Sequence, residues 1–406
     1  MKILQVNCVY KTGSTGKIVY DVHSELLNSG FESIVCYGRG AKTNDKNVYK
    51  TCSELYAKFN NLLTRFTGLM YGGCFFSTNK LIEIIKKEKP DIVHLHCING
   101  YFVNIYRLIT WLKKSKIKTV LTLHAEFVYT ANCGHALECE KWKIGCGSCP
   151  RLKKETKSIF LDRTAQSWKK MEKAFEGFND NLVITSVSDW LMERAKQSPI
   201  LSGKKHIVVL NGLDTEAFKY SNSEELRKKL GLENKKTVLF VTPAFSLDPN
   251  HFKGGYYVAQ LAKMMPEVKF VVVGNKNSEL SLPQNIIDIG RVESAHELAK
   301  YYSMADVTLL ASKKETFSMI TAESLCCGTP VVGFEAGAPE TITIPEFSKF
   351  VEYGNIDILK ASLEEFLSKD WNSLEISDKA IKKYTKKKMT ADYLKIYSNL
   401  LGETLN

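Results

Sequence analysis

Two glutamates in the second half of the chain, Glu315 and Glu323, have a spacing that suits a pair of hydrogen-bond acceptors. The apolar segment 307–311 predicts a strand, and a helical apolar pattern then continues until Gly328-Thr329-Pro330 ends it. Glu315 is expected in the turn before this helix and Glu323 about two turns inside it. Because helical side chains lean toward the N-terminus, both carboxylates can reach the space above it.

The N-terminus of the same helix is expected to attract an anion, because its first backbone N–H groups have no partner within the helix. These N–H groups belong to Thr316, Phe317 and Ser318. Two fixed acceptors for sugar hydroxyls beside an anion site describe a pocket for a sugar nucleotide. From the residues alone, the alternative is that Glu315 complements the helix dipole and that Glu323 is a solvated helix residue.

Two glycine-containing segments are further candidates for phosphate contacts. Lys253-Gly254 precedes a helix expected over 256–264, where the lysine could place a point charge beside free N–H groups. Gly13 and Gly16 lie just before a helix expected over 17–28, but their spacing fits neither a P-loop nor a dinucleotide fingerprint. A surface lysine and an ordinary connecting turn are the alternatives.

His124 follows an apolar strand expected over 119–123. The carboxyl ends of strands are the places where open parallel sheets bind their ligands, so this imidazole is a candidate site residue. A single histidine is nevertheless more often structural than catalytic, and the sequence alone leaves both roles open.

A cysteine-rich stretch follows, in which the last pair is spaced Cys-x2-Cys. Four cysteines within so short a segment could hold a structural zinc ion tetrahedrally, and His135 is a possible substitute ligand. Reduced structural thiols or a reversible disulfide are the alternatives. The four cysteines are Cys133, Cys139, Cys146 and Cys149.

The length and composition predict two globular domains, since the chain has 406 residues, of which 44% are hydrophobic and 25% charged. Strand and helix patterns alternate in two successive runs, which is typical of an α/β protein with parallel sheets. Asn211-Gly212-Leu213-Asp214 marks the change from one run to the next, and a helix is expected over 379–401. We therefore predict domains at 1–211 and 212–378, followed by a C-terminal segment at 379–406.

The sequence indicates where the protein is located and which partners its charged surfaces could contact. The N-terminus resembles a first strand rather than a signal peptide, and no apolar run approaches the roughly 20 residues of a membrane helix. A cytoplasmic location is therefore expected. The net charge is +12, and the segment 92–125 contains no acidic residue. Such a segment could contact nucleic acid, anionic lipid or a phosphorylated substrate, or could be a solvated helix face.

The segment around the two glutamates closely resembles the Glu-x7-Glu motif of family 4 retaining glycosyltransferases. This resemblance implies the GT-B fold, in which two Rossmann-like domains face each other across a cleft and a C-terminal helix crosses back to the first domain. Bacterial polysaccharide-building members have a similar cysteine-rich insert. The motif positions that match are Ser312, Glu315, Phe317, Glu323, Gly328, Thr329, Pro330 and Val331.

The resemblance also implies roles for the candidate residues. Glu323 is expected on the ribose hydroxyls, Lys253 on the donor diphosphate and Glu315 on the donor sugar. His124 would lie near the transferred sugar, so His124 and Glu315 are the expected catalytic residues. The other donor-binding candidates are Gly13, Gly16, Gly254, Thr316, Phe317 and Ser318.

The chain departs from the family pattern at two places. Most members have an acid directly after the histidine, whereas here Ala125 follows it and Glu126 comes one residue later. An arginine is usual several residues before the lysine, but Pro243-Ala244-Phe245 occupies that position. We therefore expect the donor phosphates to depend more on Lys253 and on the helix N-terminus.

The resemblance implies transfer of a sugar, with retention, from a UDP- or GDP-sugar to a glycan or lipid-linked acceptor. Bacterial capsule or O-antigen synthesis is the expected setting. No Asp-x-Asp motif stands at a strand end, so no metal or other cofactor is expected in catalysis. A sugar-nucleotide epimerase of the same fold and a non-catalytic basic protein that binds membrane or nucleic acid are the alternatives.

Finally, peripheral contact with the inner face of an anionic membrane is expected, and nucleic-acid binding is not. Aromatic side chains among the cations of 92–125 would favour the lipid headgroup region. These residues are Tyr101, Phe102, Tyr106 and Trp111.

Overall fold

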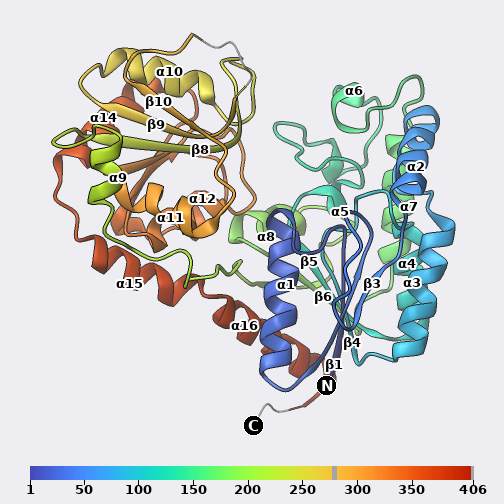
Figure 1. Cartoon of the computed structure of the whole chain (residues 1–406). Helices are drawn as coiled ribbons and strands as arrows, with labels where there is room; N and C mark the ends of the chain where they lie inside the picture. Colours follow the sequence, from blue (N-terminus) through green and yellow to red (C-terminus); the bar gives the residue numbers. More distant parts are fainter. Residues whose placement is uncertain (277–280, 404–406) are drawn as a thin grey trace. The chain divides into compact units, whose positions relative to one another are not determined.

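The computed structural model describes residues 1–276 and 281–403 and divides into two compact units. The first unit contains Met1–Asn211 and Met389–Asn406, and the second contains Gly212–Lys388. Each unit is built on one parallel sheet with helices packed against it (Figure 1). Alternating strand and helix patterns predicted this α/β architecture, because parallel strands need crossover connections.

The first unit has a seven-stranded sheet in the order β3-β2-β1-β4-β5-β6-β7. The order changes direction between β1 and β4, and a change of this kind leaves a ligand-binding crevice at the carboxyl ends of the strands. The strands are β1 (Lys2–Asn7), β2 (Glu32–Tyr37), β3 (Val48–Lys50), β4 (Ile92–Leu95), β5 (Lys118–Leu123), β6 (Leu182–Ser186) and β7 (Lys205–Val208). The helices are α1 (Gly13–Asn28), α2 (Glu54–Thr67), α3 (Phe75–Glu88), α4 (Ile105–Ser115), α5 (Phe127–Thr130), α6 (Leu152–Glu155), α7 (Thr164–Phe175) and α8 (Asp189–Lys196).

The second unit has a six-stranded sheet in the order β10-β9-β8-β11-β12-β13. Its strands are β8 (Thr237–Phe245), β9 (Lys269–Lys276), β10 (Ile286–Gly290), β11 (Val307–Leu310), β12 (Val331–Phe334) and β13 (Ser348–Val351). Its helices are α9 (Glu224–Lys229), α10 (Gly255–Met264), α11 (Ala295–Met304), α12 (Met319–Cys326), α13 (Pro339–Ile342), α14 (Ile356–Ser368) and α15 (Ser373–Tyr384).

The single helix predicted over 379–401 is two helices, α15 and α16 (Lys386–Leu401). They are separated at Thr385, whose backbone is extended (φ −66°, ψ 144°). The break has a cause: Leu213 donates its N–H to the Tyr384 carbonyl at 2.7 Å and accepts the Lys386 N–H at 3.0 Å. These backbone bonds replace the helical ones, which a periodic apolar pattern does not reveal.

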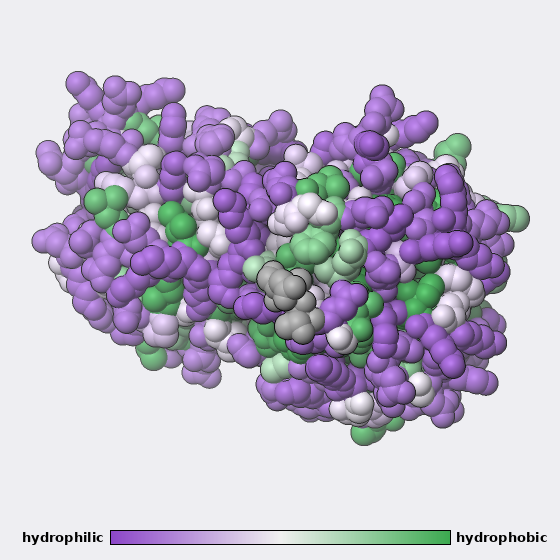
Figure 2. Space-filling model, turned by 90° about the horizontal axis from the view of Figure 1, so that it is seen from below, coloured by the Kyte–Doolittle hydropathy of each residue, from purple (hydrophilic) through white to green (hydrophobic). Residues whose placement is uncertain are grey.

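From Met389 onward, α16 packs against the sheet of the first unit, as the family resemblance implied for the C-terminal helix. Tyr393 and Tyr397 are fully buried among strand residues such as Ile3 and Val120. The apolar side chains of the strands are mainly internal. Hydrophilic residues cover most of the face drawn in Figure 2. Within the described residues, no helix has the length and apolar character that crossing a membrane requires.

Candidate active site

Two of the predicted donor-site residues, Lys253 and Glu315, contact each other directly in the second unit. The Lys253 Nζ atom lies 2.6 Å from Glu315 Oε1, and the two side chains are only 22% and 15% exposed. A partly buried ion pair of this kind holds both groups in fixed positions. The structure therefore brings together, from segments 62 residues apart, a cation suited to a diphosphate and an acceptor suited to a sugar hydroxyl.

The segment that carries Lys253 lies tightly against the end of β11. Lys313 donates its N–H to the Phe252 carbonyl at 2.9 Å. Gly254 precedes α10 with φ +73°, and a Cβ atom at this position would lie 2.1 Å from the Ala311 carbonyl oxygen. Only glycine fits there. Because the first turn of α10 contains no acidic residue, its N–H groups and Lys253 present a positive end toward an anion.

The backbone of Glu315 is held from the other side by the loop after β12. Its N–H donates to the Ala336 carbonyl at 2.9 Å, and its carbonyl accepts the Ala338 N–H at 3.3 Å. Since both its backbone and its carboxylate are fixed, Glu315 is positioned before any ligand arrives.

The helix that carries Glu323 begins later than predicted. Residue Ser318, with φ +76°, is the N-cap, and its hydroxyl accepts the Thr321 N–H, so α12 starts at Met319. Glu323 is therefore the fifth helical residue, a little more than one turn from the start rather than two. The first-turn N–H groups belong to Met319, Ile320 and Thr321 rather than to the three residues predicted.

This later start corrects the predicted roles of Thr316, Phe317 and Ser318 as first-turn amide donors. Phe317 is 3% exposed, and its ring packs nearly perpendicular to that of Tyr384, with the ring centres 6.4 Å apart. Its side chain is a core residue. The apolar pattern of the sequence assigned Phe317 to the helix, but this residue is apolar because it packs in the core.

Glu323 has a partner that the sequence analysis missed. The buried Tyr302 hydroxyl of α11 donates to Glu323 Oε2 at 2.9 Å. Burial, followed by the neighbouring Glu323 carboxylate, raises the pKa of Tyr302 well above its usual range, so the hydroxyl remains a donor. Tyr302 thus orients the carboxylate, and only the tertiary structure shows this contact.

Gly13 and Gly16 both belong to α1, which begins at Gly13 rather than at the predicted Lys17. Gly16 is closely packed, because a Cβ atom there would lie 3.1 Å from Val9 Cγ2 and 3.3 Å from the backbone nitrogen of Lys11. Lys11 also donates its N–H to the Gly16 carbonyl at 3.1 Å. The first turn of α1 contains no acid, so an anion at this terminus would meet no repulsion from it.

His124 lies at the carboxyl end of β5, as predicted, and is 8% exposed. It belongs to a chain of hydrogen bonds in which the donor and the acceptor of each bond follow from the neighbouring residues. Gln5 Nε2 donates to the Val19 carbonyl at 3.4 Å, so Gln5 Oε1 faces His96 Nε2, 3.2 Å away. Gln5 Oε1 therefore accepts a hydrogen bond from the His96 Nε2–H group. His96 Nδ1 must then accept from His124 Nε2, which lies 3.1 Å away.

His124 therefore carries its proton on Nε2, and Nδ1 holds the lone pair. Burial lowers the pKa of His124 to about 4, so the imidazole is neutral at physiological pH. The sequence drew attention to His124 but not to Gln5 and His96, which come from β1 and from the residue directly after β4.

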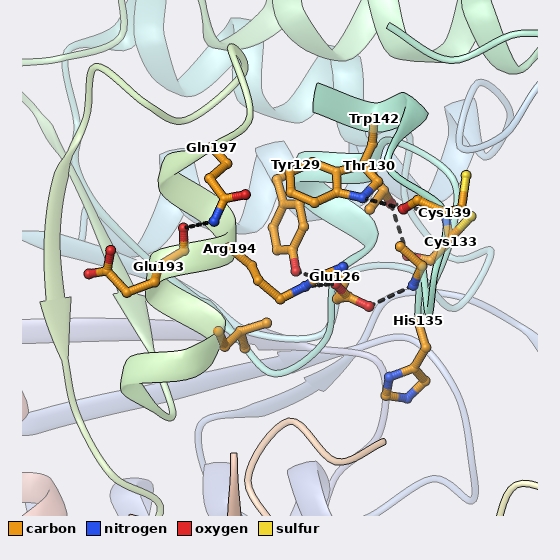
Figure 3. Close-up of polar contacts among 12 residues, drawn as sticks. Glu126, Tyr129, Thr130, Cys133, His135, Cys139, Trp142, Glu193, Arg194 and Gln197 are labelled. Carbon is orange, nitrogen blue, oxygen red and sulfur yellow. Dashed lines mark hydrogen bonds and ion pairs between the residues drawn. The ribbon is translucent and has the colours of Figure 1, made fainter. Parts of the chain in front are cut away.

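The acid near His124 is structural. Glu126 is fully buried, and its carboxylate accepts from the Arg194 Nε at 2.7 Å, the Tyr129 hydroxyl at 2.5 Å and the Ala136 N–H at 2.6 Å (Figure 3). The Arg194 guanidinium also lies 5.1 Å from the ring centre of Trp142. Glu126 thus connects the start of the cysteine-rich insert to α8, and three donors occupy its two carboxylate oxygens.

The four cysteines of the insert line one small cavity of about 20 Å³, together with Trp142 and Pro150. Burial raises the pKa of the Cys146 thiol to about 12. Among the residues that the structure describes, no three His, Cys, Asp or Glu side chains stand together so that they could hold a metal ion. Zinc at Cys133, Cys139, Cys146 and Cys149 stays a prediction of the sequence, and metal analysis tests it.

Two family models match successive parts of the chain. Residues 15–217 match the model described as Glycosyltransferase Family 4, and residues 222–388 match Glycosyl transferases group 1. WcaC of Escherichia coli K12, which has the provisional name of a colanic acid biosynthesis glycosyl transferase, is 24% identical over 98% of this chain and 100% of its own. N-acetyl-alpha-D-glucosaminyl L-malate synthase of Bacillus anthracis is 22% identical over 81% of this chain and 80% of its own.

Solved structures resemble the chain over nearly its full length. Sucrose-phosphate synthase from Thermosynechococcus elongatus has a TM-score of 0.69 at 12% identity, and the match covers 99% of this chain and 100% of that one. Anabaena Alr3699/HepE, solved in complex with UDP, has a TM-score of 0.63 at 15% identity, covering 98% and 100%. These likenesses confirm the predicted two-domain GT-B fold. The family models show that the chain belongs to glycosyltransferase family 4 and is a glycosyltransferase.

Proposed function

We propose that this glycosyltransferase moves a sugar, with retention of configuration, from a UDP- or GDP-sugar to a glycan or lipid-linked acceptor. The observation that carries the proposal is the ion pair between Lys253 and Glu315, beside the N-terminus of α10, where Gly254 packs against the Ala311 carbonyl. A fixed cation, helix N–H groups and a fixed carboxylate together suit a diphosphate joined to a sugar. Alr3699/HepE, which has a similar fold, was solved with UDP-glucose, and this supports a nucleotide-sugar donor here.

Each donor group has a proposed partner. Glu323, oriented by Tyr302, accepts from the ribose hydroxyls, and Lys253 neutralises the diphosphate. Glu315 accepts from hydroxyls of the donor sugar. Gly13 and Gly16, at the start of α1, are proposed as further donor contacts through the backbone.

Catalysis in this proposal depends on positioning and electrostatics. As the bond to the sugar breaks, negative charge grows on the leaving diphosphate, where Lys253 and the α10 N–H groups stabilise it. His124 is proposed to contact the transferred sugar as a neutral imidazole whose Nδ1 accepts a hydrogen bond from a sugar hydroxyl. No metal or other cofactor has a role in these steps.

The setting we propose is bacterial cell-surface polysaccharide synthesis, on the cytoplasmic side of a membrane. The relation to WcaC, whose name refers to colanic acid biosynthesis, supports this setting. The enzyme is proposed to contact the anionic inner surface of the membrane peripherally, where lipid-linked acceptors are found.

The test is a screen of UDP- and GDP-sugars for thermal stabilisation, followed by transfer assays with the donor that stabilises most. We expect one donor to raise the melting temperature and to yield an α- or β-linked product of the same configuration as the donor. Conversion of the donor to an isomeric nucleotide sugar without acceptor would instead identify an epimerase. Stabilisation by none of the donors would contradict the proposal.

A further inference from the structure

Helix α2 of the first unit presents its apolar side chains to solvent. Its buried residues are Ala57, Asn60 and Thr64, of which two are polar. A surface helix of a soluble protein normally has the opposite arrangement, with leucine and phenylalanine facing the core. The outward residues recur at helical spacing and are 42–80% exposed: Leu55, Phe59, Leu62, Leu63 and Phe66.

A hydrogen bond between α2 and Cys74 holds the helix in this orientation, with its apolar face outward. Asn60 Nδ2 donates to the Tyr56 carbonyl at 2.8 Å, and Asn60 Oδ1 accepts the Cys74 N–H at 2.7 Å. A Cβ atom at Gly73 would lie 2.4 Å from Asn60 Oδ1, which shows how closely the two segments meet. The polar residues of α2 are thus internal for a structural reason.

The exposed apolar residues continue onto two neighbouring segments. Phe76 at the start of α3 is 77% exposed, and its ring lies 5.9 Å from that of Tyr56 (α2 and α3, blue in Figure 1). Phe160 is 76% exposed, and its neighbour Ile159 donates an N–H to the Arg65 carbonyl at 2.9 Å. We call α2, the first turn of α3 and residues 159–161 the apolar surface. Contiguous exposed apolar patches of this kind mark interaction sites.

The charges on and around the apolar surface are mostly positive. Acidic residues at its edges include Glu54, the first residue of α2, whose carboxylate is paired with Arg39, and Asp162, which directly follows residues 159–161. The sequence from Leu55 to Ile82 contains no acidic residue, and Lys58 and Arg65 are exposed on α2 itself. Phe75, at the edge of the surface, also lines an open groove of about 510 Å³. Among the described residues, no acidic side chain lines this groove. Besides Phe75 it contains three exposed cations and two further aromatic residues: Arg107, Lys114, Lys170, Tyr106 and Trp111.

We propose that the apolar surface docks the first unit onto an anionic lipid bilayer, with lipid phosphates in the adjoining basic groove. Leucine and phenylalanine side chains would lie at the boundary of headgroups and acyl chains, as in interfacial helices. The cations of α2 and of the groove then face anionic headgroups. A second copy of the chain suits this surface less well, because it would bring the same cations against each other.

This inference deepens the membrane contact of the proposed function and changes the residues that make it. Phe102, one of the predicted anchors, is 1% exposed and packs against Gly38, where a Cβ atom would lie 2.0 Å from its ring. Tyr106 and Trp111 line the groove rather than the apolar surface, and the Tyr106 hydroxyl donates to the Met70 carbonyl at 2.7 Å.

The test is sedimentation of the full chain with phosphatidylcholine vesicles, with and without phosphatidylglycerol, at low and high salt. We expect binding to the anionic vesicles that weakens with salt. Leu62→Ser with Phe66→Ser should weaken the binding at least about tenfold, because apolar groups no longer enter the interface. Arg107→Gln with Lys114→Gln should weaken it about 30-fold at low salt, since each cation near an anionic surface contributes about fivefold.

Matched controls come from the second unit. Ile358→Ser with Leu374→Ser removes side chains of similar exposure, 49% and 62%, and Lys263→Gln with Lys382→Gln removes two exposed charges. These variants should bind like the wild type. Calorimetric binding of UDP and GDP, measured without vesicles, checks that all variants are folded and tests the donor proposal separately.

Vesicle binding that the first-unit variants lose and the controls keep supports the inference. Wild-type chain that binds no vesicles, or first-unit variants that bind as tightly as the wild type, would overturn it. So would a dimer in solution that Leu62→Ser with Phe66→Ser dissociates, because the apolar surface would then be covered by a second copy. A negative result in the vesicle assay would not contradict the proposed glycosyl transfer, since the assay contains no donor.

Discussion

Replacement of Glu323 by alanine is the perturbation for which the structure makes the most detailed prediction. The ribose hydroxyls lose a charged acceptor, and such a hydrogen bond contributes ~1.5–3 kcal/mol. At about 1.4 kcal/mol per decade, the dissociation constant for UDP or GDP should rise ~10- to 150-fold. Because the contact is to ribose, the corresponding nucleoside should lose affinity by the same factor as the diphosphate.

The same variant should also lose stability, because the buried Tyr302 hydroxyl donates to Glu323 Oε2. An unsatisfied buried hydroxyl costs about 1–3 kcal/mol. For a unit of this size, each kcal/mol lowers the melting temperature by roughly 2–4 °C. Tyr302→Phe in the Glu323→Ala background removes the orphaned hydroxyl and should recover most of that loss without restoring affinity.

The assay is isothermal titration calorimetry with the diphosphate and the nucleoside, paired with thermal unfolding. Tyr302→Phe alone is the control for orientation, and it should change affinity much less than Glu323→Ala. Unchanged affinity of Glu323→Ala for both ligands would refute the assignment of Glu323 to ribose. A loss confined to the diphosphate would place the carboxylate elsewhere in the site.

Three further predictions follow from other parts of the structure. Gly254→Ala should abolish measurable donor binding and destabilise the second unit by several times the ~1 kcal/mol expected for Gly231→Ala. Both glycines have positive φ, but only a Cβ atom at Gly254 would meet the Ala311 carbonyl. Equal losses of stability for the two variants in urea unfolding would refute the packing argument. His124, whose pKa burial lowers to about 4, should make the folded chain bind fewer protons than the unfolded chain between about pH 4 and 6.5, so the free energy of unfolding should fall as pH drops through that window. A wild type whose stability loss from pH 7 to 5 is no larger than that of His124→Gln would contradict this. The cysteine-rich insert is predicted to hold one zinc ion per chain, which Cys146→Ser with Cys149→Ser should lose, and elemental analysis that finds no zinc in the wild type would remove the prediction.

The parts of the fold that follow from periodic apolar patterns were predictable. The predicted strands over 119–123 and 307–311 lie on β5 and β11, because continuous apolar runs in a parallel sheet are buried on both faces. The pairing of Lys253 with Glu315 could be anticipated only through the family resemblance. Sequence spacing cannot show that residues 62 positions apart meet at 2.6 Å.

Other features depend on tertiary contacts that no local pattern reports. The start of α12 is set by the Ser318 cap, which the apolar Phe317 obscured in the sequence. The direction of the His124 hydrogen bond depends on Gln5, more than a hundred residues away in the chain. Helix α2 is the clearest case, because its apolar pattern predicts an inward face, whereas Asn60 turns that face toward solvent.

The central claim is that the second unit binds a nucleotide sugar with its diphosphate on Lys253. The most direct measurement is calorimetric affinity for the nucleoside diphosphate and for the nucleoside alone, in the wild type and in Lys253→Met, a substitution that keeps most of the side-chain volume. We predict that Lys253→Met weakens diphosphate binding at least about tenfold, the scale of a charge-assisted contact, and leaves nucleoside binding unchanged. Equal affinity of both proteins for the diphosphate, or an equal loss for diphosphate and nucleoside, would contradict the claim.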